Sequence, residues 1–175
     1  MIVGSIKEDL AFEKRVSLTP ETAKSIVGLG LKVFIEKEYA THLGIKDEEY
    51  EKVGVGISSS SNEVLNSSKL IIKVNCPSES EIGNIKENTI LIGMLNPSKN
   101  KHQINKIIEK KIKLFSLELL PRITRAQSMD VLSSQSNLAG YRAVIDCVAE
   151  FEKAIPMMMT AAGTIPAAKV LVIGA

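Results

Sequence analysis

Residues 120–137 are the most unusual stretch of the sequence in the chemistry of their side chains. Two arginines, an amide, a carboxylate and a hydroxyl occur there at Arg122, Arg125, Gln127, Asp130 and Ser133. These groups suit a polar ligand with phosphate, carboxamide and ribose parts, because guanidinium groups bind anions while amides, hydroxyls and carboxylates pair with the rest. A solvated loop, with Ser133 or Ser136 capping the next helix, fits the same composition. The residues alone leave both interpretations open.

The elements that must position this stretch alternate between strands and helices. Residues 70–74 and 90–94 are nearly continuous apolar runs, typical of strands covered on both faces. Thr19 and Pro20 predict the start of a helix, and Asp47 is expected to cap a short acidic one. We predict further strands at residues 2–4, 32–36 and 112–117, and further helices near residues 63–65 and at 100–110. This order indicates an α/β fold with a doubly wound, mostly parallel sheet. Residues 120–137 then follow the carboxyl end of a strand, where ligands of such sheets bind.

Composition excludes several classes of protein. The 175 residues are 45% hydrophobic and 24% charged with a net charge of +2, which indicates a globular domain with no nucleic-acid patch. The lysines of residues 99–113 have helical spacing and are interpreted as a solvated helix face. Cys76 and Cys147 form no metal-spaced set, so we expect no metal site and inert or buried thiols.

The pattern changes from Ser134. Helical spacing continues to about Ile155, and the long helix it predicts is typical of a bridge between domains. Residues 156–175 are long enough to span a membrane, but two prolines and a glycine favour a loop and a buried strand at 169–173. Gly174 follows that strand as at the start of a dinucleotide-binding unit, so we expect a Rossmann domain to be truncated there. The predicted domains are residues 1–133, an interdomain helix at 134–156, and a linker with that first strand at 157–175.

One family carries the same motifs. Residues 121–144 read Pro-Arg-Ile-Thr-Arg-Ala-Gln-Ser-Met-Asp-Val-Leu-Ser-Ser-Gln-Ser-Asn-Leu-Ala-Gly-Tyr-Arg-Ala-Val, which resembles the signature loop and helix of the NAD(H)-binding component of proton-translocating transhydrogenases. Residues 13–20 and 157–166 resemble it too. The resemblance implies a flavodoxin-like N-terminal domain whose loop lies against the nicotinamide held by a second domain. By this resemblance Arg122, Gln127, Asp130 and Ser133 contact the nicotinamide side, and the backbone from Arg122 through Ile123 and Thr124 to Arg125 forms the neighbouring wall. Gly174, directly after the predicted strand, is expected to bind the cofactor as the first glycine of the nucleotide domain.

The resemblance also implies cofactors and partners. The family transfers hydride from NADH to NADP+ held on a partner component, coupled to proton passage through a membrane component, so NAD(H) and NADP(H) are the expected cofactors. We expect a homodimer with no transmembrane segment and no nucleic acid, located in the cytoplasm and peripheral to the inner membrane through its complex. No residue is expected to act as an acid or base.

Two alternatives stay open. Alanine dehydrogenase is related and resembles this chain at Arg15 and Lys73, where it binds its substrate carboxylate, but it needs a histidine where this sequence has Asn96. Deamination benefits from a general acid or base, whereas hydride transfer between nicotinamides does not. His42 and His102 are interpreted as structural or surface residues. The second alternative is a truncated module that assembles or binds without catalysis, since most of the affinity for NAD(H) would come from the missing domain.

Overall fold

The computed structural model describes residues 1–174. The chain divides into two compact units, Met1–Asp130 and Val131–Ala175. The first unit contains, in chain order, β1 (Ile2–Ser5), α1 (Pro20–Gly28), β2 (Lys32–Glu36), the 3-10 helix η1 (Thr41–Leu43), α2 (Asp47–Glu51), β3 (Gly56–Ser58), α3 (Ser61–Ser67), β4 (Leu70–Asn75), α4 (Glu79–Asn84), β5 (Ile90–Met94), α5 (Lys101–Glu109), β6 (Lys113–Ser116), and the 3-10 helices η2 (Leu117–Leu119) and η3 (Thr124–Met129).

The sheet of the first unit has six strands in the order β3-β2-β1-β4-β5-β6. Every neighbouring pair is parallel, and Val3 of β1 lies opposite Val33 of β2 on one side and Leu70 of β4 on the other. Without the short edge strand β3, the order is that of flavodoxin-like sheets, so the predicted fold class is confirmed with one added edge strand. The chain reverses its direction of winding between β1 and β4, and this switch point is where open α/β sheets form a crevice.

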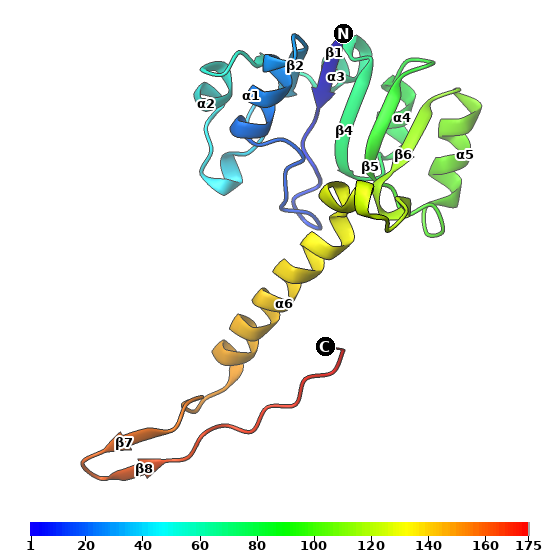
Figure 1. Cartoon of the computed structure of the whole chain (residues 1–175). Helices are drawn as coiled ribbons and strands as arrows, with labels where there is room; N and C mark the ends of the chain where they lie inside the picture. Colours follow the sequence, from blue (N-terminus) through cyan, green and yellow to red (C-terminus); the bar gives the residue numbers. More distant parts are fainter. Residues whose placement is uncertain (175) are drawn as a thin grey trace. The chain divides into compact units, whose positions relative to one another are not determined.

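The helices of the first unit lie on both faces of the sheet (Figure 1), and an apolar core is buried between the helices and the sheet on each face. On one face α1 and α2 pack on the sheet through side chains that include Ala23, Val33, Ile35 and Tyr50. On the other face α3, α4 and α5 pack on β4 and β5; the residues of this core include Val64, Leu65, Ile71, Ile82, Leu91 and Ile107. Strand β4 contributes to both cores, through Ile71 on one face and Leu70 and Ile72 on the other, as its continuously apolar sequence predicts; β5 contributes Leu91 to the second core alone.

The helix starts follow from local hydrogen bonding. Thr19 caps α1 through a reciprocal pair of bonds with Thr22, as predicted for the Thr-Pro sequence. The prediction for Asp47 was wrong: Lys46 is the N-cap of α2, and the Asp47 carboxylate instead accepts the backbone N–H of Glu38, whose φ is 58°. The helix α4 was not predicted, although Ser78 and Glu81 form a capping box at its start.

The second unit consists of the helix α6 (Val131–Glu150) and the antiparallel hairpin of β7 (Met158–Thr160) and β8 (Gly163–Ile165). The long helix begins before the predicted Ser134 and ends before Ile155, which precedes Pro156 and therefore disfavours helical backbone. The hairpin lies where a loop was predicted. No helix within residues 1–174 is long and apolar enough to cross a bilayer.

The predicted strand at residues 169–173 is not a strand in the structure. Its apolar side chains are exposed, from 69% at Val172 to 89% at Ile173. A strand forms by pairing with a neighbour, and no segment of residues 1–174 pairs with this one. Gly174, which follows this segment, has a left-handed φ of 82°.

The Cys147 thiol, which was expected to be buried or inert, lies on α6 and is exposed.

Candidate functional site

The segment of residues 120–130, called the loop segment below, is ordered by short backbone hydrogen bonds. Strand β6 ends at Ser116, and η2 turns the chain away from the sheet edge. Ile123 N–H then donates to the Pro121 carbonyl at 3.0 Å, and Ala126 N–H donates to the Ile123 carbonyl at 2.9 Å, at the start of η3. The predicted irregular loop is therefore largely 3-10 helical, which holds its side chains in fixed order along a tight turn.

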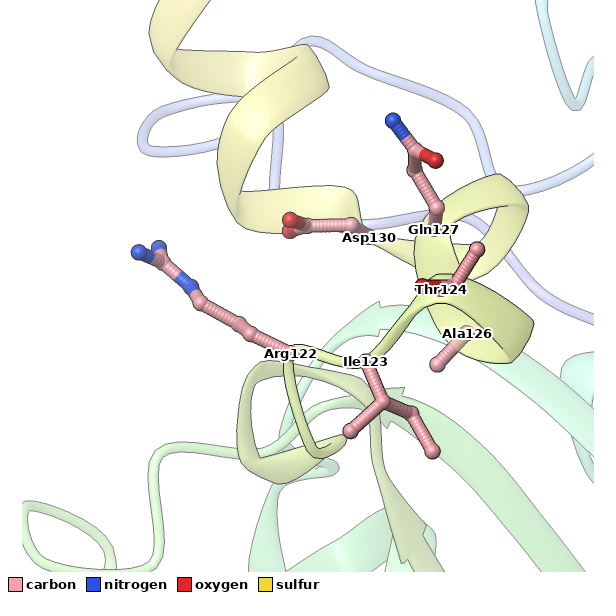
Figure 2. A pocket seen from close by; sticks show the side chains of 6 residues that line it. All are labelled: Arg122, Ile123, Thr124, Ala126, Gln127 and Asp130. Atoms are coloured by element: carbon pink, nitrogen blue, oxygen red, sulfur yellow. The ribbon is translucent and has the colours of Figure 1, made fainter.

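Six residues of the loop segment surround a pocket of ≈ 280 Å³ (Figure 2). They are Arg122, Ile123, Thr124, Ala126, Gln127 and Asp130. Five of them are predicted site residues, and the structure brings these five together. Arg125 is not among the lining residues, and Ser133 and Gly174 belong to the second unit. Ala126 was not predicted; it is the buried residue of the group, at 7% exposure, and anchors the segment on the domain.

Two polar side chains of this pocket, those of Arg122 and Gln127, face solvent. Figure 2 shows the side chains of Arg122 and Asp130 extending to the same side of the loop segment, with Gln127 and Ile123 pointing in opposite directions. Arg122 and Gln127 are exposed, and within residues 1–174 their side chains form no hydrogen bond or ion pair; Asp130 is half-buried. A guanidinium, an amide that both donates and accepts, and a carboxylate can together bind the carboxamide and ribose of a nicotinamide nucleotide. They fit that cofactor by chemistry, and none of them is a histidine.

A second polar group, called the switch-point cluster below, lies at the carboxyl ends of β1 and β4 and consists of Glu8, Glu13, Arg15, Lys73 and Glu81. Lys73 is 5% exposed, and its Nζ lies 2.8 Å from Glu81 Oε1 and 3.7 Å from Glu8 Oε2. The Val74 N–H donates to Glu8 at 2.7 Å. Burial raises the pKa of Glu8, and this effect exceeds the opposing one of Lys73. The strand pairing is irregular here, between Ile72 and Asn75, as is common beside sites.

Arg15 forms a two-point ion pair with Glu13. Its Nε donates to Glu13 Oε1 at 2.8 Å and its Nη2 to Glu13 Oε2 at 2.6 Å. Hydrogen bonds from Arg15 lower the pKa of Glu13, and the same carboxylate raises the pKa of Arg15. In this geometry the Arg15 guanidinium is bound within the chain, by a carboxylate two residues away.

Hydrogen bonds made by hydroxyl groups hold the motif of residues 13–20 against the sheet. Tyr39 Oη accepts the Ser17 N–H at 3.1 Å and lies 2.7 Å from Ser5 Oγ, whose hydroxyl donates to the Ile72 carbonyl at 2.8 Å. This buried network helps to explain why residues 13–20 can be recognised as a motif: Ser17 bonds to three different strands or loops, and its neighbours must follow a fixed path.

Neither histidine approaches the pocket of ≈ 370 Å³ beside Lys73. His42 Nε2 lies 2.7 Å from the Lys14 carbonyl oxygen, and exposed His102 pairs with Glu79. Asn96, which the sequence comparison with alanine dehydrogenase singled out, has a φ of 44°, and its N–H donates to Glu118. Burial raises the pKa of the Cys76 thiol, which lines the same pocket, to about 11, so it is protonated near neutral pH.

The sequence prediction missed Glu8, Glu81 and Glu118. Glu8 and Glu81 meet Lys73 only through the fold, since they lie on separate elements. A signal existed for Glu81, because Ser78 and Glu81 have the spacing of a capping box, which places a helix start directly after β4. For Glu118 the sequence carried no such signal.

Comparisons with known proteins identify relatives along most of the chain. Residues 4–139 match the family model for the alanine dehydrogenase/PNT N-terminal domain. In Rhodospirillum rubrum, the first of the separate chains of NAD(P) transhydrogenase subunit alpha is 44% identical over 99% of this chain and 47% of that protein. The NAD(P) transhydrogenase subunit alpha of Haemophilus influenzae is 38% identical over 100% of this chain and 34% of that protein. An alanine dehydrogenase of Methanococcus maripaludis is 34% identical over 80% of this chain and 37% of that protein. The chain thus spans less than half of the length of each.

Solved structures agree. A transhydrogenase of Sinorhizobium meliloti superimposes with a TM-score of 0.91 at 43% identity, over 96% of this chain and 50% of that chain. An L-alanine dehydrogenase superimposes with a TM-score of 0.64 at 24% identity, over 67% of this chain and 32% of that chain, which supports the shared fold alone. With the parallel sheet and the motifs of residues 13–20 and 121–144 in place, the chain belongs to the alanine dehydrogenase/PNT N-terminal domain family.

Proposed function

We propose that this chain supplies the nicotinamide-facing wall of the NAD(H) site in a proton-translocating NAD(P) transhydrogenase. The observation that carries the proposal is the pocket of the loop segment, where Arg122, Gln127 and Asp130 line one cavity at the carboxyl end of β6. The similarity to transhydrogenase alpha subunits over nearly the whole chain supports it.

The proposed work of these residues is to bind and orient. Gln127 can donate to and accept from a carboxamide, Asp130 can accept bonds from hydroxyls, and Arg122 can bind an anion. Nicotinamide rings exchange a hydride directly, so the protein supplies apposition and exclusion of water, with ring carbons about 3–3.5 Å apart. The absence of histidine from the residues lining the pocket is consistent with a reaction that needs no proton donor at the reacting carbon.

The proposal extends to the rest of the assembly. Residues 1–133 act as the N-terminal domain and residues 134–156 as the interdomain helix. Residues 157–175 act as the linker and first strand of a nucleotide-binding domain. In that domain the segment 169–173 pairs with neighbours outside residues 1–174, and Gly174 binds the cofactor. Ser133 and the backbone of Arg125 complete the nicotinamide side. The assembly is a homodimer in the cytoplasm, bound to the inner membrane through a membrane component and a component that holds NADP(H).

Alanine dehydrogenase activity is the competing function, and Arg15 and Lys73 at the switch point favour it. Against it stand Asn96 in place of histidine and the pairing of both cations with carboxylates of the chain itself. An assembly or binding module without catalysis is the third candidate.

One pair of assays on the complete assembly separates these functions. NADH with a thionicotinamide analogue of NADP+ should show hydride transfer, and NADH with pyruvate and ammonia should show none. Oxidation of NADH only in the second mixture would establish the amino-acid dehydrogenase and refute the proposal. Inactivity in both, with NADH bound, would indicate the binding module.

A further inference from the structure

Glu118 lies at the turn between the sheet and the loop segment. It is the central residue of η2, directly after β6, and the loop segment begins two residues later. The turn itself has weak local support, since Leu120 N–H reaches the Leu117 carbonyl at 3.3 Å. A three-residue 3-10 helix does not by itself fix the direction of the chain that leaves it. Other contacts must therefore set the course of the loop segment.

The Glu118 carboxylate provides two such contacts. Its Oε1 accepts the backbone N–H of Asn96 at 2.5 Å and the hydroxyl of Ser116 at 2.8 Å. One oxygen atom thus joins the backbone after β5 to the end of β6 and to η2. Hydrogen bonds to a charged acceptor are the stronger ones in proteins, so this oxygen is an effective fastening point.

The backbone that Glu118 holds is itself fixed. Asn96 has the left-handed φ of 44°, and its carbonyl accepts the N–H groups of Lys99 and Asn100 at 2.9 and 3.0 Å. The Asn100 side chain donates to the Leu95 carbonyl at 2.8 Å, and Leu95 is fully buried. Glu118 is therefore attached to a rigid turn of the domain and not to a mobile one.

The second oxygen of Glu118 shows that the carboxylate is placed for this purpose. Oε2 is buried and, within residues 1–174, has no hydrogen-bond partner. A buried acceptor without a partner is unfavourable, and a surface glutamate would leave it in water. The bonds of Oε1 to Asn96 and Ser116 offset this penalty.

We propose that Glu118 is a positioning residue, which fixes the loop segment, and with it Arg122, Gln127 and Asp130, by fastening η2 to the backbone of Asn96. Its effect on hydride transfer rests on the proposed function, whereas its effect on the order of the loop segment does not. Glu118 acts through the backbone and contacts no cofactor.

Hydrogen exchange of the full chain tests the positioning directly. Glu118→Ala should raise the exchange rates of the Asn96 amide and of amides 122–130 roughly tenfold, while the amide of buried Ile71 in β4 exchanges as in the native chain. Glu118→Gln retains a neutral acceptor for both bonds and should restore most of the native protection, with exchange closer to the native chain than to the alanine variant. Ser116→Ala removes one bond and should give a smaller increase. Glu109→Ala, at an exposed glutamate of α5, is the matched control.

Unchanged exchange rates at residues 122–130 in both Glu118→Ala and Ser116→Ala would overturn the proposal. Exchange in Glu118→Gln as fast as in Glu118→Ala would also overturn it. If Glu118→Ala does not fold, Ser116→Ala and Glu118→Gln still decide.

Single-turnover hydride transfer in the complete assembly is the second readout. Glu118→Ala should slow it with the Kd for NADH unchanged, and Glu118→Gln should rescue it. A loosened loop segment with an unchanged transfer rate would leave the positioning role intact and count against the proposed function.

Discussion

Two polar groups lie at the carboxyl ends of the same parallel sheet, and their hydrogen bonding differs. In the switch-point cluster, Lys73 and Arg15 are paired with carboxylates of the chain, and Lys73 is 5% exposed. In the loop segment, Arg122 and Gln127 are exposed and, within residues 1–174, have no such partners. The first arrangement satisfies its own charges, and the second leaves groups for a ligand. Under the proposed function the ligand binds at the loop segment, although open α/β sheets usually bind ligands at the switch point.

The largest expected effect is the loss of the buried cation. Lys73→Met leaves Glu8 and Glu81 without their shared partner, and breaking a buried ion pair in this way lowers the free energy of unfolding by about 3–5 kcal/mol. Urea unfolding measures it. Lys106→Met, which removes a cation from the exposed pair with Glu79, is the control and should change little. Equal losses in the two variants would show that the switch-point cluster does not stabilise the domain.

The next effect concerns the loop segment. Gln127→Ala should slow single-turnover hydride transfer in the complete assembly roughly a hundredfold, because small errors in apposition reduce the rate strongly. The Kd for NADH should change less. Gln103→Ala truncates an amide that lines the pocket beside Lys73 and should leave the rate unchanged. If Gln103→Ala slows hydride transfer and Gln127→Ala does not, the switch-point pocket and not the loop segment would be the nicotinamide site.

A smaller effect is expected in the hydroxyl network that supports the switch-point cluster. Tyr39→Phe removes the acceptor of the Ser17 N–H and a partner of Ser5, both part of a buried network. The free energy of unfolding should fall by about 1–2 kcal/mol. Thermal or urea unfolding tests this value, and a variant as stable as the native chain would show that the hydroxyls find other partners.

The smallest effect is a dependence of stability on pH. Burial raises the folded-state pKa of Glu8 above 4.5, so the folded protein holds more protons and stability falls as pH rises through that raised pKa. The pKa of Glu13 is lowered by Arg15, so its contribution is present above 4.5 and is lost as pH falls through the lowered pKa. Glu8→Gln should remove the first change and Glu13→Gln the second. The test is the midpoint of urea unfolding, measured as a function of pH in the acid range for the native chain and both variants. If the three curves of midpoint against pH run parallel, neither Glu8 nor Glu13 causes the pH dependence.

The portion of the fold that sequence predicts is the portion with strong local patterns. Strands β4 and β5 were predicted from their continuous apolar runs, and α1 because Thr19 and Pro20 define its start. Strand β3 has three residues and exists through its pairing with β2, which no local pattern encodes. Residues 169–173 show the converse: they have the apolar pattern of a strand, but no segment within residues 1–174 pairs with them, so they do not form one.

The candidate site divides in the same way. The polar composition of the loop segment is visible in the sequence, and five predicted residues line one pocket. The carboxylates Glu8 and Glu81 reach Lys73 from separate elements of the fold, and the bond from Glu118 to Asn96 joins residues 22 positions apart. Such contacts follow from the fold and could not be read from spacing.

The most direct test of the central claim follows isoleucine methyl groups by NMR during a titration of the complete assembly with NADH. Ile123 lines the pocket of the loop segment, and Ile82 lies on α4 next to Glu81 of the switch-point cluster. We predict that the Ile123 methyl signal shifts in proportion to bound NADH while the Ile82 signal does not move. A shift of Ile82 with an unchanged Ile123 would contradict the account and place the ligand at the switch point.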